Sequence, residues 1–220
     1  MFINRTSNFT KYFLIIIFII INHSFGSGGF DHGTSTGKGK IQIDLTWNPF
    51  NYFKYGQNYI VANYGITDKF DLHSYYANHP NFLDGTNSYY IGLYYQFVDS
   101  KLIDLATAIG KRKMEYLNYS HIFFPQLLYN IKLKNSYTLG GSFVNVSNIN
   151  RFGIRKSENN WHTFDLALFI PINNISFIKR IEYIEDIKIG VGVFSDNQNK
   201  DYRELYPTYS IDIKFKKIIN

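Results

Sequence analysis

The stretch that decides the fold is Lys40-Ile41-Gln42-Ile43-Asp44-Leu45-Thr46-Trp47. Every second residue from Ile41 to Trp47 is large and apolar, and the residues between them are polar. Successive side chains of a β-strand point to opposite faces, so this alternation predicts a strand with one apolar face and one polar face.

The same alternation recurs along the chain, and it predicts about ten strands. We expect them near residues 39–48, 57–66, 70–77, 88–97, 102–111, 119–131, 136–147, 159–172, 186–195 and 206–215. One face of these segments is apolar and aromatic, and the other is rich in small and polar residues. Small side chains fit the interior of a narrow barrel, and large apolar ones fit an exterior that faces lipid. The sequence therefore favours an all-β fold, a closed antiparallel up-and-down membrane β-barrel, over a soluble barrel.

The connections between these segments alternate in length. Residues 67–69, 98–101 and 132–135 form tight turns, and the connections between the other pairs of strands are longer. Outer-membrane barrels have short periplasmic turns and longer external loops, which this alternation matches. Residues 173–185 break the pattern. They fit either an amphipathic turn of helix, with Phe177, Ile181 and Ile184 on one face, or an extra pair of short strands or an over-long hairpin.

Composition excludes several other classes of protein. The chain has 220 residues and no cysteine, which removes disulfide frameworks, thiolate metal sites and cysteine nucleophiles. It is 45% hydrophobic and 19% aromatic, which is incompatible with a disordered chain.

The N-terminus has the features of an export signal. Residues 1–26 combine Arg5 and Lys11 with an apolar run and small residues at the expected cleavage site. We therefore expect a signal peptide over 1–26, a flexible mature N-terminus over 27–38 and the barrel over 39–220. Removal of the two basic residues of the leader lowers the net charge from +6 to +4, which is too small to suggest a nucleic-acid partner.

The segment Tyr64-Gly65-Ile66-Thr67-Asp68-Lys69-Phe70-Asp71-Leu72 resembles a hairpin that recurs in small porin-like and transporter-like barrels of Gram-negative outer membranes. The resemblance implies a barrel that is inserted by the outer-membrane assembly machinery. Within the hairpin, Thr67, Asp68 and Lys69 form the turn, and we expect the Asp68 side chain to close it onto the backbone.

Strand parity assigns the polar residues that would line the lumen, and position near strand ends assigns the aromatic residues that would form a girdle at the membrane interface. The lumen candidates are Gln42, Asp44, Gln96, Asp104, Asp165, Lys188, Asp212 and Lys214. The girdle candidates are Trp47, Tyr75, Tyr76, Tyr89 and Tyr119. Charges inside a narrow barrel must either pair and plug it or contact water in a pore.

Three functions remain open at this point. The first is a small pore or passive transporter for small polar solutes in the outer membrane of a Gram-negative-type cell. The second is a structural or surface-binding barrel with a plugged lumen, and the third is a soluble periplasmic or extracellular barrel that binds a small apolar ligand. We expect no enzymatic activity, because Ser, His and acidic residues do not fall in register on one face. We also expect no cofactor, no metal and no nucleic-acid partner. The expected partners are the lipid bilayer, the assembly machinery and small solutes.

Overall fold

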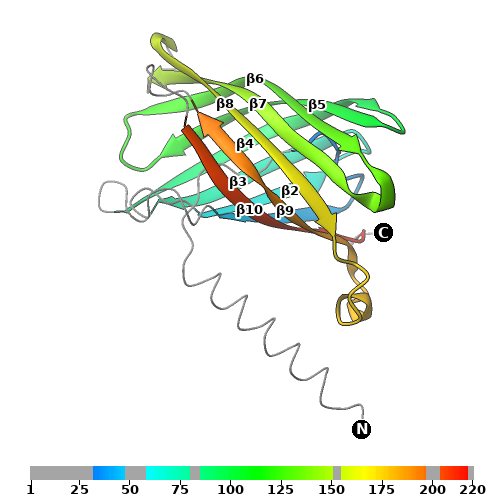
Figure 1. The fold of residues 1–220 in the computed structure, drawn as a ribbon. Helices are drawn as coiled ribbons and strands as arrows, with labels where there is room; N and C mark the ends of the chain where they lie inside the picture. The colour runs from blue at the N-terminus through cyan, green and yellow to red at the C-terminus, as the bar shows by residue number, and fades with distance from the viewer. Residues whose placement is uncertain (1–31, 48–57, 80–84, 151–154, 197–203, 218–220) are drawn as a thin grey trace.

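The chain folds into a closed barrel in which each strand pairs with its neighbours along the sequence, and the first pairs with the last (Figure 1). The computed structural model describes residues 32–47, 58–79, 85–150, 155–196 and 204–217. The strands are β1 Ile41–Trp47, β2 Asn58–Gly65, β3 Phe70–His79, β4 Thr86–Asp99, β5 Ile103–Met114, β6 Tyr119–Lys132, β7 Thr138–Asn150, β8 Arg155–Pro171, β9 Ile184–Asp196 and β10 Glu204–Phe215. The predicted fold class is therefore confirmed.

Closure of the barrel depends on the pairing of β1 with β10. The two strands run antiparallel, and Asp44 lies directly opposite Asp212 in their register. Because β1 also pairs with β2 on its other side, no strand edge is left open. A closed ladder satisfies the backbone hydrogen bonds of every strand, which is a requirement for a sheet that faces lipid. No helix in the described part of the chain is long and apolar enough to cross a membrane.

The two faces of the wall differ as the alternation predicts, and β4 shows this most clearly. Tyr90, Tyr94 and Gln96 are buried, whereas Ile91 and Leu93 between them are 61% and 52% exposed. An exterior of large exposed apolar side chains is costly in water and favourable in lipid. The barrel therefore has the surface of a membrane-spanning protein.

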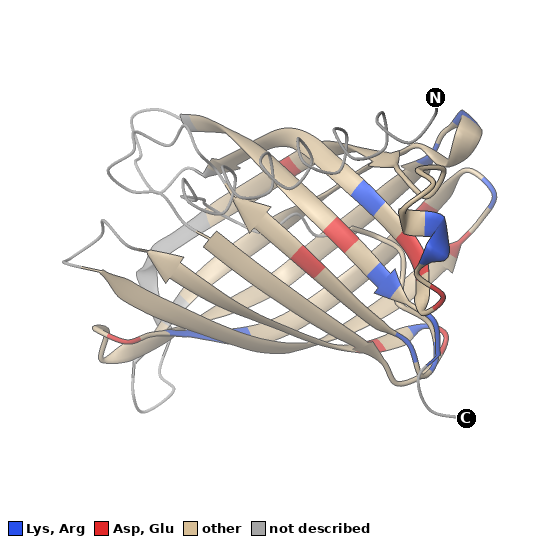
Figure 2. Ribbon diagram, turned by 90° about the horizontal axis from the view of Figure 1, so that it is seen from below, with Lys and Arg blue, Asp and Glu red and all other residues tan. Residues whose placement is uncertain are grey.

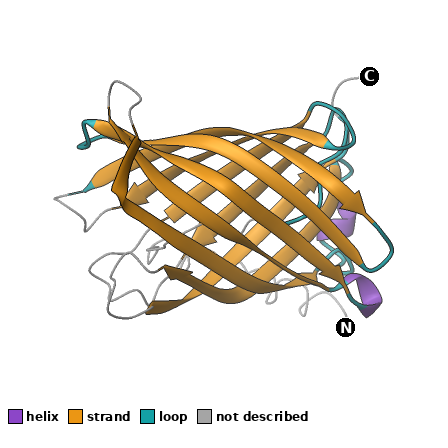
Figure 3. Ribbon diagram, turned by 90° about the horizontal axis from the view of Figure 1, so that it is seen from above, coloured by secondary structure: helices purple, strands orange, loops and turns teal. Residues whose placement is uncertain are grey.

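The two ends of the barrel are built differently (Figures 2 and 3). At one end, short turns over residues 66–69, 100–102 and 133–137 connect β2 to β3, β4 to β5 and β6 to β7. The chain leaves β10 at the same end, and charged residues gather there (Figure 2). We call this the turn end. The described connection at the opposite end, residues 115–118, joins β5 to β6, and it is no longer than the turn over 66–69, although a longer loop was expected there.

The connection between β8 and β9 contains a single 3-10 turn, η2 Ile178–Arg180. Of the alternatives left open for residues 173–185, the structure has a turn of helix, but a shorter one than the predicted amphipathic face requires. Phe177, which was expected on its apolar face, is 56% exposed, and Ile178 is the buried residue. Ile184 already belongs to β9. The segment is too short for a helical face to form, so one isoleucine anchors it.

Candidate functional site

The chain before β1 folds back into the lumen at the turn end. Gly37 and Gly39 both have positive φ angles, and Lys40 N donates a hydrogen bond to Gly37 O. The turn crosses β2 at Gly65, where a Cβ would lie 1.9 Å from Gly37 O. Glycine is required at this crossing because two backbones approach closely. We call residues 32–38 the inner segment.

The inner segment is held by hydrogen bonds from successive strands of the wall. Its backbone and hydroxyl groups meet inward-facing side chains on β3, β4, β5 and β6. The bonds are Thr36 N to Asp71 Oδ2 at 2.7 Å, Ser35 N to Gln96 Oε1 at 2.8 Å, Thr34 Oγ1 to Asp104 Oδ2 at 2.7 Å and Asn130 Nδ2 to Thr34 Oγ1 at 2.7 Å. Buried backbone N–H groups need such acceptors, because an unsatisfied one costs stability. The segment therefore fits this wall specifically.

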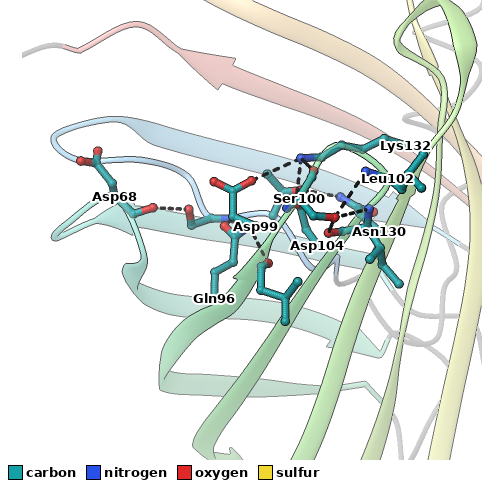
Figure 4. A network of polar contacts seen from close by, with 12 residues as sticks. Asp68, Gln96, Asp99, Ser100, Leu102, Asp104, Asn130 and Lys132 are labelled. Carbon is teal, nitrogen blue, oxygen red and sulfur yellow. Dashed lines mark hydrogen bonds and ion pairs between the residues drawn. The ribbon is translucent and has the colours of Figure 1, made fainter.

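The wall against which the inner segment lies is stabilised by an ion pair between β5 and β6, next to the β4–β5 turn (Figure 4). Asp104 is completely buried, and Lys132 Nζ lies 2.8 Å from its Oδ1. Lys132 also donates a hydrogen bond of 2.7 Å to Ser100 O. The lysine compensates the charge of a carboxylate that has no access to water.

The hairpin between β2 and β3 also faces the inner segment. Thr67 Oγ1 accepts hydrogen bonds from Lys69 N at 3.2 Å and Phe70 N at 2.9 Å. The Asp68 carboxylate instead accepts a hydrogen bond from Lys38 N at 3.2 Å, and Asp68 O accepts one from Ser35 Oγ at 2.6 Å. The turn is therefore closed by Thr67, and the expectation that Asp68 closes it is wrong. Sequence alone could not show that a distant segment would use this carboxylate.

Residues 27–38, which include the inner segment, were expected to be flexible. Residues 27–31, like the predicted leader over 1–26, lie outside the described residues. The rest of the range is held in place, and Ser35 and Thr36 are 8% and 2% exposed. Its glycine, serine and threonine content, which indicates a loop in a sequence, also suits a chain that must lie against backbone in a narrow space.

Aromatic side chains fill the lumen along β2, β3, β4 and β6. The Tyr75 ring stacks on the Tyr90 ring with centroids 5.0 Å apart, and Tyr59 and Phe123 extend the group at 5.1 and 5.4 Å. Gly110 makes room for this group, because a Cβ there would lie 2.2 Å from the Tyr90 ring. We call these four aromatic residues the tyrosine cluster.

A girdle requires side chains on the outer face, and some of the predicted residues have this position while others do not. Tyr76 and Tyr89 are exposed on the outside with ring centroids 5.4 Å apart. Trp47 is also on the outer face of its strand and stacks on Tyr209. Tyr75 faces the lumen, since adjacent residues of a strand point to opposite faces and Tyr76 points outward. Tyr119 also faces inward, where it packs against buried His121 at 5.4 Å.

The predicted lumen residues all fall on inward-facing positions, but they meet different partners. Gln42, Asp44, Gln96, Asp104, Asp165 and Asp212 are buried, and Lys188 and Lys214 are partly exposed. Gln96 and Asp104 bind the inner segment, and Asp165 accepts hydrogen bonds from the backbone N–H and hydroxyl of Ser142. Whether any of them lines a path for solutes stays a prediction.

An open cavity of about 160 Å³ lies beside the inner segment. Its lining includes Lys188, Lys214, Asp212 and Gln42 from β9, β10 and β1. His32 of the inner segment also borders it, as well as a second void of about 10 Å³ that is lined by Asp44 and Asp71. Burial, together with the charges of Lys188 and Lys214, lowers the pKa of His32 to about 3, so its imidazole is neutral.

Sequence reasoning missed several residues of this site. Asp71 and His73 have inward parity on the predicted strand 70–77, so the alternation could have identified them. Asn130 and Thr34 gave no such signal, because their importance comes from contact with each other across the lumen.

Comparisons with known proteins give a likeness only at the level of the barrel. No family model matches the chain, and no curated protein matches it. Two similar solved structures are described as "KdgM porin" and "KdgM porin in complex with disordered oligogalacturonate", with TM-scores of 0.41 and 0.42. Each is 9% identical to this chain, and each alignment covers 80% of this chain and 98% of the other. The functional argument below therefore rests on the barrel and its lumen.

Proposed function

We propose that this protein is an outer-membrane β-barrel that forms a small pore or passive channel for small polar solutes. The observation that carries the proposal is the contrast between the two faces of a closed barrel. Ile91 and Leu93 are among the large apolar side chains exposed outside, while a polar cavity of about 160 Å³ opens inside. A surface of this kind favours lipid, and a hydrated interior favours polar solutes.

The proposal includes export and assembly. Residues 1–26 would act as a cleaved signal peptide, and the mature chain would begin with the segment that enters the lumen. The outer-membrane assembly machinery would insert the barrel, with the turn end facing the periplasm and the longer connections outside. The chemistry of such a channel is passive, so no catalytic group is assigned.

The inner segment supports a second candidate, a structural or surface-binding barrel with a plugged lumen. Its hydrogen bonds to Asp71, Gln96 and Asp104 occupy polar groups that would otherwise contact solvent in a pore. In this case the loops at the far end would carry the function, and the lumen would serve stability alone.

Conductance in planar bilayers separates the two candidates. The mature chain from residue 27 is refolded, and a shift in gel migration between unboiled and boiled samples confirms that the barrel is closed. The same measurement is made on a variant that lacks residues 27–38. Since the inner segment narrows the lumen at the turn end, the pore proposal expects conductance from the mature chain and a larger conductance from the shortened one.

Each result decides between the candidates. If both proteins fold and neither conducts, the pore proposal fails and the structural barrel remains. If only the shortened variant conducts, the inner segment closes the mature barrel, and the second candidate describes the resting protein. A protein found wholly in the soluble fraction after cell lysis contradicts both.

A further inference from the structure

Three side chains from distant parts of the sequence meet on the inner wall where the barrel closes. They are His32 of the inner segment, Asp44 of β1 and Asp212 of β10. One nitrogen or oxygen atom from each lies within 4.8 Å of the corresponding atoms of the other two. The group is therefore compact enough to surround one ion.

The two carboxylates are close to each other and shielded from water. Asp44 and Asp212 are direct partners across the β1–β10 pair, and they are 2% and 6% exposed. Gln42 Nε2 donates a hydrogen bond of 2.9 Å to Asp44, and Ser210 Oγ donates one of 2.7 Å to Asp212. These donors orient the two carboxylates, and like charges at such short range disfavour each other.

The lysines of the neighbouring cavity have acidic neighbours of their own. Lys188 Nζ lies 3.4 Å from Asp186, and Lys214 Nζ lies 3.9 Å from Glu185. Both lysines border the same cavity as Asp212, so their fields reach it. Lys188 is also the cross-strand partner of Asp212, so one positive charge already acts on that carboxylate.

His32 adds a nitrogen ligand to this pair. Its Nδ1 is buried and has no hydrogen-bond partner in the part of the chain that the structure describes. Its Nε2 lies 2.6 Å from Gln42 Nε2, which also donates the hydrogen bond to Asp44 and so links the two residues. His32 and Asp44 border the void of about 10 Å³, which has roughly the volume of one water, and His32 and Asp212 border the cavity of about 160 Å³.

We propose that His32, Asp44 and Asp212 bind one divalent transition-metal cation and thereby tie the inner segment to the wall. One imidazole and two carboxylates form a donor set that suits Zn²⁺ or Mn²⁺, with water completing the coordination. The cation would lie between the two buried carboxylates and reduce the repulsion between them. It would also connect the chain before β1 to the strand pair that closes the barrel.

The test measures metal binding by the untagged mature protein, refolded in detergent and freed of metal by chelation and dialysis. ZnCl₂ or MnCl₂ is added, bound metal is determined by elemental analysis, and the midpoint of thermal unfolding is followed by circular dichroism. We expect one metal per chain and a higher midpoint in its presence. MgCl₂ serves as the comparison, because Mg²⁺ prefers oxygen ligands and retains its water.

Variants identify the ligands. His32→Gln, Asp44→Asn and Asp212→Asn should each weaken binding by at least roughly tenfold, the smaller effect usual for the loss of a supporting group around a metal. Asp165→Asn and His79→Gln are matched controls, since both residues lie in the lumen outside the cluster and should leave binding unchanged. Gel migration of unboiled samples confirms that every variant forms the barrel.

Three outcomes overturn the proposal. Absence of stoichiometric binding shows that the two carboxylates share a proton or use the nearby lysines. Binding that survives both aspartate substitutions shows an adventitious ion only. Unchanged binding in His32→Gln shows that the inner segment is not tied by the metal. None of these measurements involves conduction, so their failure leaves the proposed function untouched.

Discussion

Removal of the Asp71 carboxylate should release the inner segment from the wall. Thr36 N donates a hydrogen bond of 2.7 Å to Asp71 Oδ2, and Thr36 is only 2% exposed. In Asp71→Ala the N–H group loses its acceptor while it stays buried. Asp71 is on β3 and faces the lumen, so the substitution removes no contact with lipid and no ladder hydrogen bond.

The size of the effect follows from this one bond. Loss of a buried acceptor costs about 1–3 kcal/mol, and the carboxylate places this bond in the upper part of the range. If the segment exchanges between a bound and a released state, that cost raises the released fraction roughly 5- to 150-fold. In the protein without this substitution, the bonds from Thr36, Ser35 and Thr34 together keep the released state a minority.

Thiol labelling can measure the released fraction because the chain contains no cysteine. Ser35→Cys introduces one thiol at a buried position. It replaces the hydroxyl that donates to Asp68 O and leaves the bond from Ser35 N to Gln96 intact, so the effect of a second substitution is compared only between proteins that carry it. Lys38→Cys introduces one at an exposed position of the same segment. We expect a maleimide to label residue 38 quickly and residue 35 slowly. Asp71→Ala should then accelerate labelling at residue 35 by the factor given above.

The reasoning is refuted if Cys at position 35 reacts as fast as Cys at position 38 in the otherwise unchanged protein, since the segment would then not be inside the barrel. It is also refuted if Asp71→Ala leaves the slow rate unchanged. Asp165→Ala is the control. Its carboxylate binds Ser142 and makes no hydrogen bond to the described part of the inner segment, so its loss should not change the rate.

Three further substitutions test other parts of the structure. Gly110→Val drives a side chain into the Tyr90 ring, and we expect a loss of about 1–3 kcal/mol in the free energy of unfolding, measured with urea. Ile91→Arg places a charge on the outer face in the middle of β4, and we expect a loss of about 2–4 kcal/mol for the barrel folded in lipid vesicles. An unchanged stability would argue against a membrane location. Lys132→Met leaves the Asp104 carboxylate without its ion pair of 2.8 Å and should lower stability by about 1–3 kcal/mol, seen as a lower thermal midpoint.

The barrel could be predicted from the sequence because its signal is local and repeated. Alternation such as that of Ile41 to Trp47 depends only on which face meets lipid, and the same condition holds on every strand. The parity of Asp44 and Asp212 then placed both carboxylates inside. Two errors in the girdle, Tyr75 and Tyr119, arose because aromatic residues were assigned by their position near strand ends, without regard to parity.

The inner segment could not be predicted by the same reasoning. Residues 33–38 contain glycine, serine, threonine and lysine without any period, which in a sequence alone indicates a loop. Their order comes from contacts with β3 to β6, at separations such as that between Thr34 and Asn130. No local pattern encodes which polar group of a wall will meet which atom of a loop.

The lumen has filled and open parts, and their arrangement constrains any path for solutes. The tyrosine cluster fills the lumen next to β2, β3, β4 and β6. The inner segment forms hydrogen bonds with Asp71, Gln96 and Asp104 at the turn end. The cavity of about 160 Å³ is bordered by the inner segment and by residues of β1 and β6 to β10, among them Lys188 and Lys214. A solute that crosses the barrel with the segment in place would have to pass through that cavity. There it meets both lysines and acids within a few ångströms, so a path of this kind should discriminate by size more strongly than by the sign of the charge.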